Sequence, residues 1–314
     1  MICTPLCELC GIRYPVFQGG MAHVSEAGLA AAVTNAGGLG ILSAMSRDGT
    51  YVREQIRRAR TLTDGPIGVN VMLMSPFLDE VAAVIAEEAV EVVTTGAGDP
   101  SAYIELWKNA GCRVIPVIPS VALAKRMDRT GADAVIAEGG ESGGHIGELA
   151  TMPLVPQIVD AVSVPVLAAG GIADGRGVAA SLMLGASGVQ LGTRFLAAVE
   201  CGIHPHYKEL VLKAGDTATI VTGRRLGHPV RSLKTPYSRN YAKLEYTDIS
   251  AEDLEQLGIG SLRKAAVDGD VKEGCYIAGQ IAGLVNREQT AAEIIEEIMA
   301  ETEMVLKNAV NFLR

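Results

Sequence analysis

The strongest constraint on the fold of this chain is a repeat, in which a short apolar run is followed by a stretch with helical periodicity. Apolar runs such as residues 164–168 are typical of strands that are buried on both faces. The expected strands are residues 15–18, 40–43, 67–72, 90–94, 113–118, 134–137, 164–168 and 188–191. The expected helices between them are residues 26–35, 53–61, 77–88, 102–110, 122–130, 155–161 and 177–184. Strands that alternate with helices in this way predict a parallel sheet covered by helices.

The absence of two glycine motifs decides between an open sheet and a closed barrel. An open doubly wound sheet normally carries G-x-G-x-x-G after its first strand, but no such motif follows a strand here, and G-x4-G-K-[ST] occurs nowhere. We therefore expect an α/β fold, a (β/α)8 TIM barrel with a C-terminal cap or extension. The barrel is expected over residues 1–200 and an irregular cap or lid over its mouth at 201–275. A return segment at 276–314 is expected to end in an amphipathic helix, residues 290–312, packed on the barrel.

Composition and charge exclude several classes of function. Acidic residues number 36 against 27 basic ones, the net charge is −9 and only 4% of residues are aromatic, so nucleic-acid binding is not expected. No apolar run approaches the roughly 20 residues that cross a bilayer, and the first ten residues do not read as a signal peptide. We expect a cytoplasmic protein that does not bind membranes.

The six cysteines are read as reduced thiols. Cys3, Cys7 and Cys10 have a spacing that radical enzymes use to hold a [4Fe–4S] cluster. This triplet precedes the first strand rather than following one, and Cys10 occupies an apolar slot where a small hydrophobic residue would serve. No metal site is therefore expected.

Phosphate binding is indicated at the ends of the last two expected strands. Gly170 and Gly171 follow the seventh strand, and Gly192 and Thr193 follow the eighth. Barrels often bind phosphate at this pair of loops, where glycines let backbone N–H groups approach an anion. The other expected strands end in small or polar residues, which leave room for a large planar cofactor.

The segment after the sixth strand holds the candidate catalytic residue. Five glycines occur in residues 138–147 and predict a mobile loop whose backbone can lie close to a ligand. His145 lies among these glycines and is suited to donate a proton or a hydrogen bond to an oxyanion. His204 and His206 are expected to be structural or rim residues, because no third metal ligand accompanies them.

A basic stretch interrupts the acidic chain. Between residues 217 and 244 there is no Asp or Glu, while six basic residues occur: Arg224, Arg225, Arg231, Lys234, Arg239 and Lys243. This stretch is either a solvated cap with scattered charge or a landing surface for an anion, such as a dinucleotide, a phosphopantetheine arm or an acidic carrier protein.

Five motifs together resemble the FMN-dependent enoyl-acyl-carrier-protein reductases, within the wider nitronate monooxygenase-like flavoproteins. The motifs are YPVFQGGM at residues 14–21, GVNVM at 68–72, VTTGAG at 93–98, GGHIG at 143–147 and AAGGIADG at 168–175. The likeness extends from about residue 9 to residue 280. Two positions depart from it: His23 stands where an aromatic residue is expected, and residues 43–45 are less glycine-rich than usual.

The resemblance implies that FMN lies over the barrel mouth. The residues implied to bind it are Gly19, Gly20, Met21, Ala22, Asn70, Thr95, Glu138, Gly143, Gly144, Gly170, Gly171, Gln190, Gly192 and Thr193. His145 would lie near the reacting substrate, a trans-2-enoyl thioester on an acyl carrier protein, in the last step of the fatty-acid elongation cycle. NADH or NADPH as reductant, a homodimer and, in some members, a monovalent cation are also implied.

Three other functions remain open on the residues alone. Nitronate monooxygenase shares nearly all of these motifs, and its equivalent histidine would act as a base. A reductase module acting on polyketide chains differs mainly in the acyl chain. A flavin-free barrel that binds a sugar phosphate is the alternative from another class.

Overall fold

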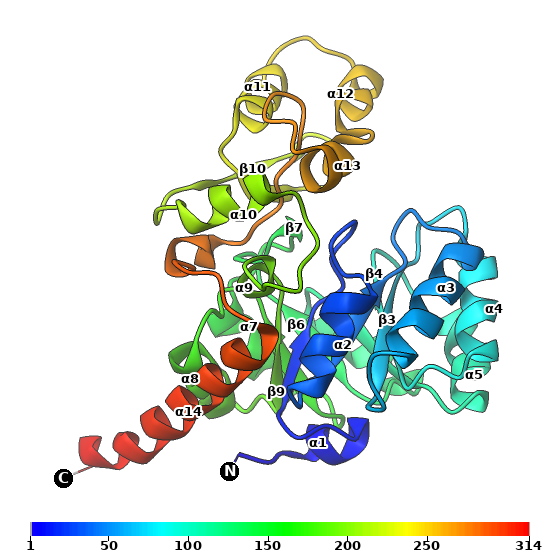
Figure 1. Ribbon diagram of the computed structural model, residues 1–314, viewed down its shortest axis with the longest axis vertical. Helices are drawn as coiled ribbons and strands as arrows, with labels where there is room; N and C mark the ends of the chain where they lie inside the picture. The colour runs from blue at the N-terminus through cyan, green and yellow to red at the C-terminus, as the bar shows by residue number, and fades with distance from the viewer. Residues whose placement is uncertain (1, 314) are drawn as a thin grey trace.

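The computed structural model describes residues 2–313, and its centre is a closed barrel of eight parallel strands (Figure 1). The strands are β1(Val16–Gln18), β2(Gly40–Ser43), β3(Ile67–Met72), β4(Val92–Gly96), β5(Arg113–Ile118), β6(Val135–Glu138), β8(Val166–Ala169) and β9(Gly188–Leu191). They follow the order β1-β9-β8-β6-β5-β4-β3-β2. Phe17 pairs with Leu39 and the N–H of Gln18 donates to the Leu39 carbonyl at 2.9 Å, which joins the two ends of the sheet. The predicted TIM-barrel fold is confirmed.

Helices cover the outside of the barrel. They are α2(Ala27–Asn35), α3(Gly49–Arg60), α4(Leu78–Glu87), α5(Ser101–Asn109), α6(Val121–Arg129), α7(Thr151–Val159) and α8(Gly175–Met183). Helix α3 begins four residues before the expected position, because the Asp48 side chain accepts the Tyr51 N–H at 2.8 Å and caps a polar first turn that apolar periodicity does not reveal. None of the helices in residues 2–313 is both long and apolar enough to cross a membrane.

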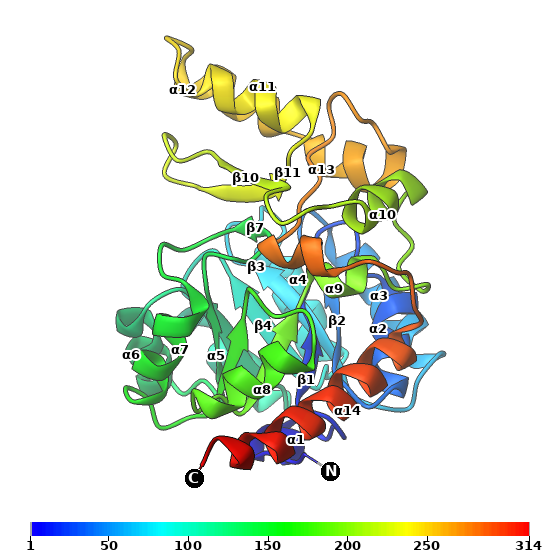
Figure 2. The same ribbon diagram turned by 90° about the vertical axis from the view of Figure 1, so that its left-hand side faces the viewer.

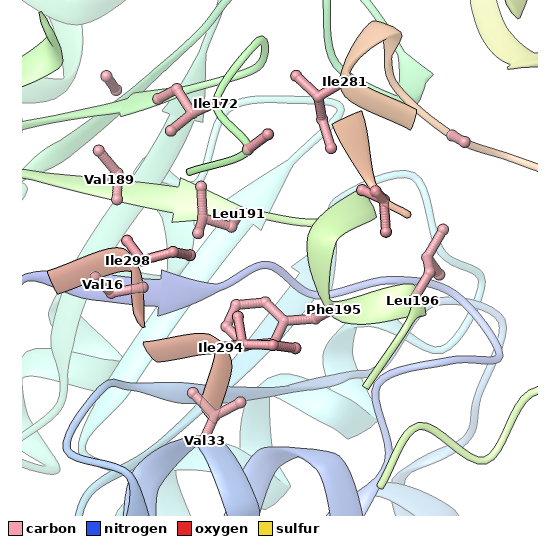
Figure 3. Close-up of a cluster of buried hydrophobic side chains, with 14 of the residues drawn as sticks. Val16, Val33, Ile172, Val189, Leu191, Phe195, Leu196, Ile281, Ile294 and Ile298 are labelled. Carbon is pink, nitrogen blue, oxygen red and sulfur yellow. The ribbon is translucent and has the colours of Figure 1, made fainter. Parts of the chain in front are cut away.

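The C-terminal helix packs against the barrel. Helix α14(Ala291–Ala309) begins with a capping box between Thr290 and Glu293 and lies against α8 and α2. Figure 3 shows Ile294 and Ile298 of this helix beside Phe195 and the strands that carry Val16 and Val189. These side chains form one continuous apolar cluster, which fixes the C-terminal segment over the last strand and the first.

The N-terminal helix α1(Pro5–Cys10) closes the base of the barrel. Leu6 is fully buried, and Cys7 and Cys10 are buried with it beside Phe17 and Leu167. Within residues 2–313 no group of three or more His, Cys, Asp or Glu side chains is arranged to hold a metal ion. Burial also raises the pKa of Cys10 to about 12, which disfavours the thiolate that a cluster needs.

The segment between the barrel and the C-terminal helix is ordered, not irregular as the sequence predicted. It contains α10(Pro205–Leu212), β10(Thr219–Thr222), β11(Val230–Leu233), α11(Pro236–Leu244), α12(Ala251–Gly258), α13(Ser261–Arg263) and a π-helix, Lys264–Asp268. These elements are stacked above the barrel mouth in both views (Figures 1 and 2). These elements are short and interrupted by turn residues, so the sequence shows no helical or strand periodicity over them.

A third strand of the cap sheet comes from the barrel. Strand β7(Gly144–His145) lies between β6 and α7 in sequence but pairs with β11, so that the small sheet has the order β10-β11-β7. The sequence predicted a mobile glycine loop here. Backbone pairing with a segment more than eighty residues away holds it as a strand instead, and local sequence carries no signal of such a partner.

Candidate functional site

A pocket opens at the carboxyl ends of β6, β8, β9 and β1, beneath the cap. It encloses about 630 Å³ of empty space, a figure that includes open solvent at its mouth. The predicted residues that line it are Gly19, Gly20, Met21, Glu138, Gly143, Gly170, Gly171, Gln190, Gly192 and Thr193. Ala22, Asn70, Thr95, Gly144 and His145 do not line it. Parallel strands bring these loops together because their carboxyl ends meet at one rim.

The glycine loops after β8 and β9 present hydrogen-bond donors to the pocket. Gly170 and Gly171 have φ of 86° and 74°, a left-handed conformation that a side chain would strain. Within residues 2–313, the N–H groups of Gly171, Gly192 and Thr193 donate no hydrogen bond. The Thr193 hydroxyl oxygen accepts the Gly279 N–H at 2.8 Å, so its own proton remains available to a ligand. This set of donors suits a phosphate group.

Glu138 supplies an ionisable group to the same pocket. Enclosure by the surrounding protein raises the pKa of its carboxyl to about 7, and the nearby Ser142 hydroxyl offsets part of that rise. Ser142 Oγ is buried, yet it forms no hydrogen bond of ordinary geometry within residues 2–313. The pocket therefore offers a carboxyl whose pKa lies near neutrality and, close to it, a buried hydroxyl that makes no hydrogen bond of ordinary geometry in the described part of the chain.

A second glutamate braces the loop after β6. The Glu141 carboxylate accepts hydrogen bonds from the Thr151 N–H at 3.0 Å and the Thr151 hydroxyl at 2.9 Å. Its own carbonyl accepts the Gln280 N–H at 2.9 Å. The Thr151 hydroxyl also lies 2.9 Å from the carbonyl oxygen of Gly170, within hydrogen-bond distance. The start of α7, the β6 loop and the phosphate loop are thus held together by one network.

His145 lies at the cap side of the pocket, two residues beyond the lining Gly143. Its side chain is exposed, although partial enclosure by protein lowers its pKa, and the nearby His228 lowers it further. The N–H of Ile146 donates to the Pro229 carbonyl at 3.0 Å, which continues the attachment to the cap. The imidazole is therefore favoured in its neutral form at a position that the cap sheet fixes.

Asn70 contacts the pocket-lining Gly20 but does not itself line the pocket. A Cβ added to Gly20 would lie 2.2 Å from the Asn70 Cβ, so the β1 loop passes directly over this residue. The Asn70 amide oxygen accepts the Thr94 hydroxyl at 3.0 Å. Thr95 is buried in β4, and Ala22 is half-buried in the loop after β1. Asn70 thus supports the backbone of the β1 loop.

The C-terminal return segment builds a part of the pocket that the sequence did not predict. Ile277, Gly279 and Ile281 line it, and a Cβ on Gly143 would lie 2.7 Å from the Ala278 backbone. The other lining residues that were not predicted are Glu141, Ser142, Ala169, Ile172, Leu191 and Leu196. The dense small and apolar residues at 277–283 were the only available signal, and they read equally well as core.

Two of the basic residues in the cap have structural partners. Arg231 donates to the Gly140 carbonyl through Nε at 3.1 Å and Nη2 at 2.8 Å. Arg225 donates to the carbonyls of Thr247 at 3.0 Å and Ile249 at 2.7 Å. The exposed residues without an ion pair or hydrogen bond from their side chains within residues 2–313 are Arg224, Lys234, Arg239 and Lys243. The landing-surface hypothesis therefore concerns these four alone.

Comparison with known proteins gives a consistent relationship over the full chain. The sequence matches the family described as nitronate monooxygenase at residues 3–87 and 75–301. It is 46% identical to FabK from Thermotoga maritima, with a TM-score of 0.98 and 100% of both chains covered.

Two curated relatives carry different names. One, 34% identical with 98% of both sequences covered, is a (3aS,4S,5R,7aS)-5-hydroxy-7a-methyl-1-oxo-octahydro-1H-indene-4-carboxyl-CoA dehydrogenase from Mycobacterium tuberculosis. Another, 32% identical over 96% of this chain and 98% of the relative, is a probable nitronate monooxygenase from Staphylococcus aureus. These similarities indicate an oxidoreductase, and the chain belongs to the nitronate monooxygenase family.

Proposed function

We propose that this protein is an FMN-dependent reductase of trans-2-enoyl thioesters on acyl carrier protein, acting in fatty-acid elongation with NADH or NADPH. The observation that carries the proposal is the likeness to FabK over the full length of both chains. The motifs that resemble FMN-dependent enoyl-acyl-carrier-protein reductases support it, because three of the five, at residues 14–21, 143–147 and 168–175, contribute residues to a single pocket.

The pocket suits FMN in both its polar and its apolar parts. The N–H groups of Gly171 and Gly192, which donate no hydrogen bond within residues 2–313, and the Thr193 hydroxyl are assigned to the phosphate. Met21 and Ile277 offer apolar walls to the ring system. Within the described part of the chain, a Cβ at Gly192 would have only Met21 within 4 Å, so the loop leaves open space for a ligand.

Bound FMN would supply the redox chemistry, taking two electrons from the nicotinamide and delivering them to the enoyl thioester. The chain binds and orients the reactants. Because its pKa is lowered, neutral His145 keeps one ring N–H to donate to the thioester oxygen as negative charge develops there. Glu138, with a pKa of about 7, holds a proton part of the time at neutral pH and donates or accepts at the pocket wall.

A second function, oxidation of alkyl nitronates with oxygen, is favoured by the family description and by the Staphylococcus aureus relative. In that reaction the neutral imidazole of His145 would serve as a base. The lowered pKa of this residue suits both reactions, so electrostatics at His145 does not separate them.

Anaerobic half-reactions test the proposal. The purified protein is reduced with NADH or NADPH, crotonyl thioester is added, and the flavin absorbance is followed. Rapid return of the oxidised spectrum is expected for the reductase. A flavin that stays reduced with the thioester, together with nitronate-dependent oxygen consumption, would establish the monooxygenase instead. A colourless protein that does not bind FMN would overturn both.

A further inference from the structure

A group of positively charged and hydrogen-bond-donating side chains lies at the barrel mouth, next to the pocket but outside its lining. His23 follows β1, two residues after the pocket-lining Met21, and Arg47 follows β2. The two loops are joined by a hydrogen bond from the Ser43 N–H to the Ser25 carbonyl at 3.0 Å. Figures 1 and 2 show the loop after β1 rising toward α13 of the cap, which ends at Arg263.

The contacts of Arg47 hold its guanidinium in place without neutralising it. Arg47 Nη2 lies 3.1 Å from His23 Nδ1, and its Cζ lies 4.2 Å from the centre of the Tyr51 ring. Since Arg47 can only donate, His23 Nδ1 accepts, which leaves the His23 proton on Nε2 as a further donor. The hydroxyl of Tyr51 is fixed in turn by Glu26 at 2.8 Å. Arg47 forms no ion pair within residues 2–313, although Asp48 is its neighbour in sequence.

Backbone strain marks the same two loops. His23 and Ser46, which precedes Arg47, have φ of 58° and 57°, a region that side chains other than glycine rarely adopt. Arg263 lies close enough to act on the charge of His23, although its guanidinium is also paired with Asp268 at 2.9 Å. Residues with strained backbone conformations cluster at active sites and at segments that hold ligands.

We propose that Arg47 and His23, with Arg263 above them, bind a phosphate group of the substrate outside the redox pocket. A planar guanidinium matches the geometry of a phosphate and binds it through two parallel hydrogen bonds. Both reactants of the proposed reductase carry phosphate at a distance from the reacting atoms. The nicotinamide dinucleotide contains a pyrophosphate, and the acyl thioester is attached to a phosphopantetheine. The identity of the bound phosphate depends on the proposed function, whereas the existence of the site does not.

Kinetics with matched pairs of substrates identify which phosphate binds. Crotonyl-phosphopantetheine is compared with crotonyl-pantetheine, and NADH with reduced nicotinamide mononucleotide. Arg47→Met is expected to raise KM for the phosphate-bearing member of one pair about tenfold or more, with kcat nearly unchanged and with little effect on the other member. Arg58→Met, which removes an equal charge from an exposed side chain on α3 that has no ion pair or hydrogen bond within residues 2–313, should leave every KM unchanged. Arg47→Lys should fall between the two, because it keeps the charge and loses the planar fork.

Calorimetric binding of inorganic pyrophosphate separates this site from the proposed function. Wild-type protein is compared with Arg47→Met, so that any binding at the glycine loops cancels in the difference. If the wild-type protein has no reductase activity but binds pyrophosphate more tightly than Arg47→Met does, the phosphate site is supported and the proposed function is refuted. Active reductase in which Arg47→Met alters neither pyrophosphate binding nor any KM would overturn the site alone. Equal KM changes for both members of each pair would also overturn it, since they would show a structural effect.

Discussion

His145 and Val230 face each other in the antiparallel pairing of β7 with β11. A strand of the cap therefore fixes the backbone at His145, although this residue belongs to a loop of the barrel. Gly144 and Arg231 form the adjacent pair, and Arg231 reaches back to the carbonyl of Gly140. The cap therefore contributes to the geometry of the candidate site. It sets the position of the candidate catalytic side chain relative to a pocket that the barrel builds.

Replacing His145 tests its role in the second half-reaction. His145→Ala is expected to lower the rate of thioester reduction about a hundredfold, because a positioned donor is lost at the developing oxyanion. FMN content and reduction by the nicotinamide should change little, since His145 does not line the pocket. Stopped-flow absorbance measures the two half-reactions separately. His228→Gln is the control and should retain the rate; equal losses in both variants would argue against His145.

The close approach of Gly20 to Asn70 predicts a steric effect on the β1 loop. Gly20→Ala would place a Cβ 2.2 Å from the Asn70 Cβ, a contact that requires backbone movement. We expect a loss of about 1–3 kcal/mol in the free energy of unfolding and weaker FMN binding. Gly202→Ala is the matched control, because no atom of residues 2–313 would lie within 4 Å of its added Cβ. Denaturant unfolding and flavin titration report the two effects, and similar behaviour of both variants would contradict the structure at this loop.

The raised pKa of Glu138 predicts a specific pH dependence of stability. Between an ordinary value of 4.5 and the folded value of about 7, the folded state keeps a proton that the unfolded chain has released. The free energy of unfolding must therefore fall as pH rises through this window, by about 3 kcal/mol from this residue. Glu138→Gln should remove that decline. Urea unfolding of cofactor-free protein at pH 5 and pH 7.5 measures it, and identical pH slopes in the two proteins would refute the assignment.

Arg231 is predicted to stabilise the attachment of the cap to the barrel. Arg231→Met removes two hydrogen bonds to the Gly140 carbonyl and should lower the free energy of unfolding by about 2 kcal/mol. The neighbouring Arg224 is exposed, and within residues 2–313 no partner of its side chain is found. Arg224→Met, which removes the same charge, should leave stability unchanged. Comparable losses in both variants would point to net charge rather than to the Gly140 contact.

The repeat of apolar runs was sufficient to predict the barrel strands because a parallel strand buried on both faces is mostly apolar along its length. Strand β3 is predicted at its observed bounds, Ile67–Met72, and β9 at Gly188–Leu191. The same signal fails for β7, which is two residues long and pairs only with the distant β11. It also fails for the cap helices, whose short lengths leave too few turns to display a periodicity.

By itself, the sequence determined that glycines and polar residues gather at one end of a parallel barrel, since strand ends can be read from local pattern. Only the tertiary structure decided that Ile277 and Gly279 complete the pocket and that His145 is held by the cap. It also decided that Arg47, which has no ion pair within residues 2–313, lies against His23 and Tyr51. These relationships join residues far apart in the chain. Their energies come from packing and hydrogen bonds that exist only after the barrel has closed, so local sequence carries no record of them.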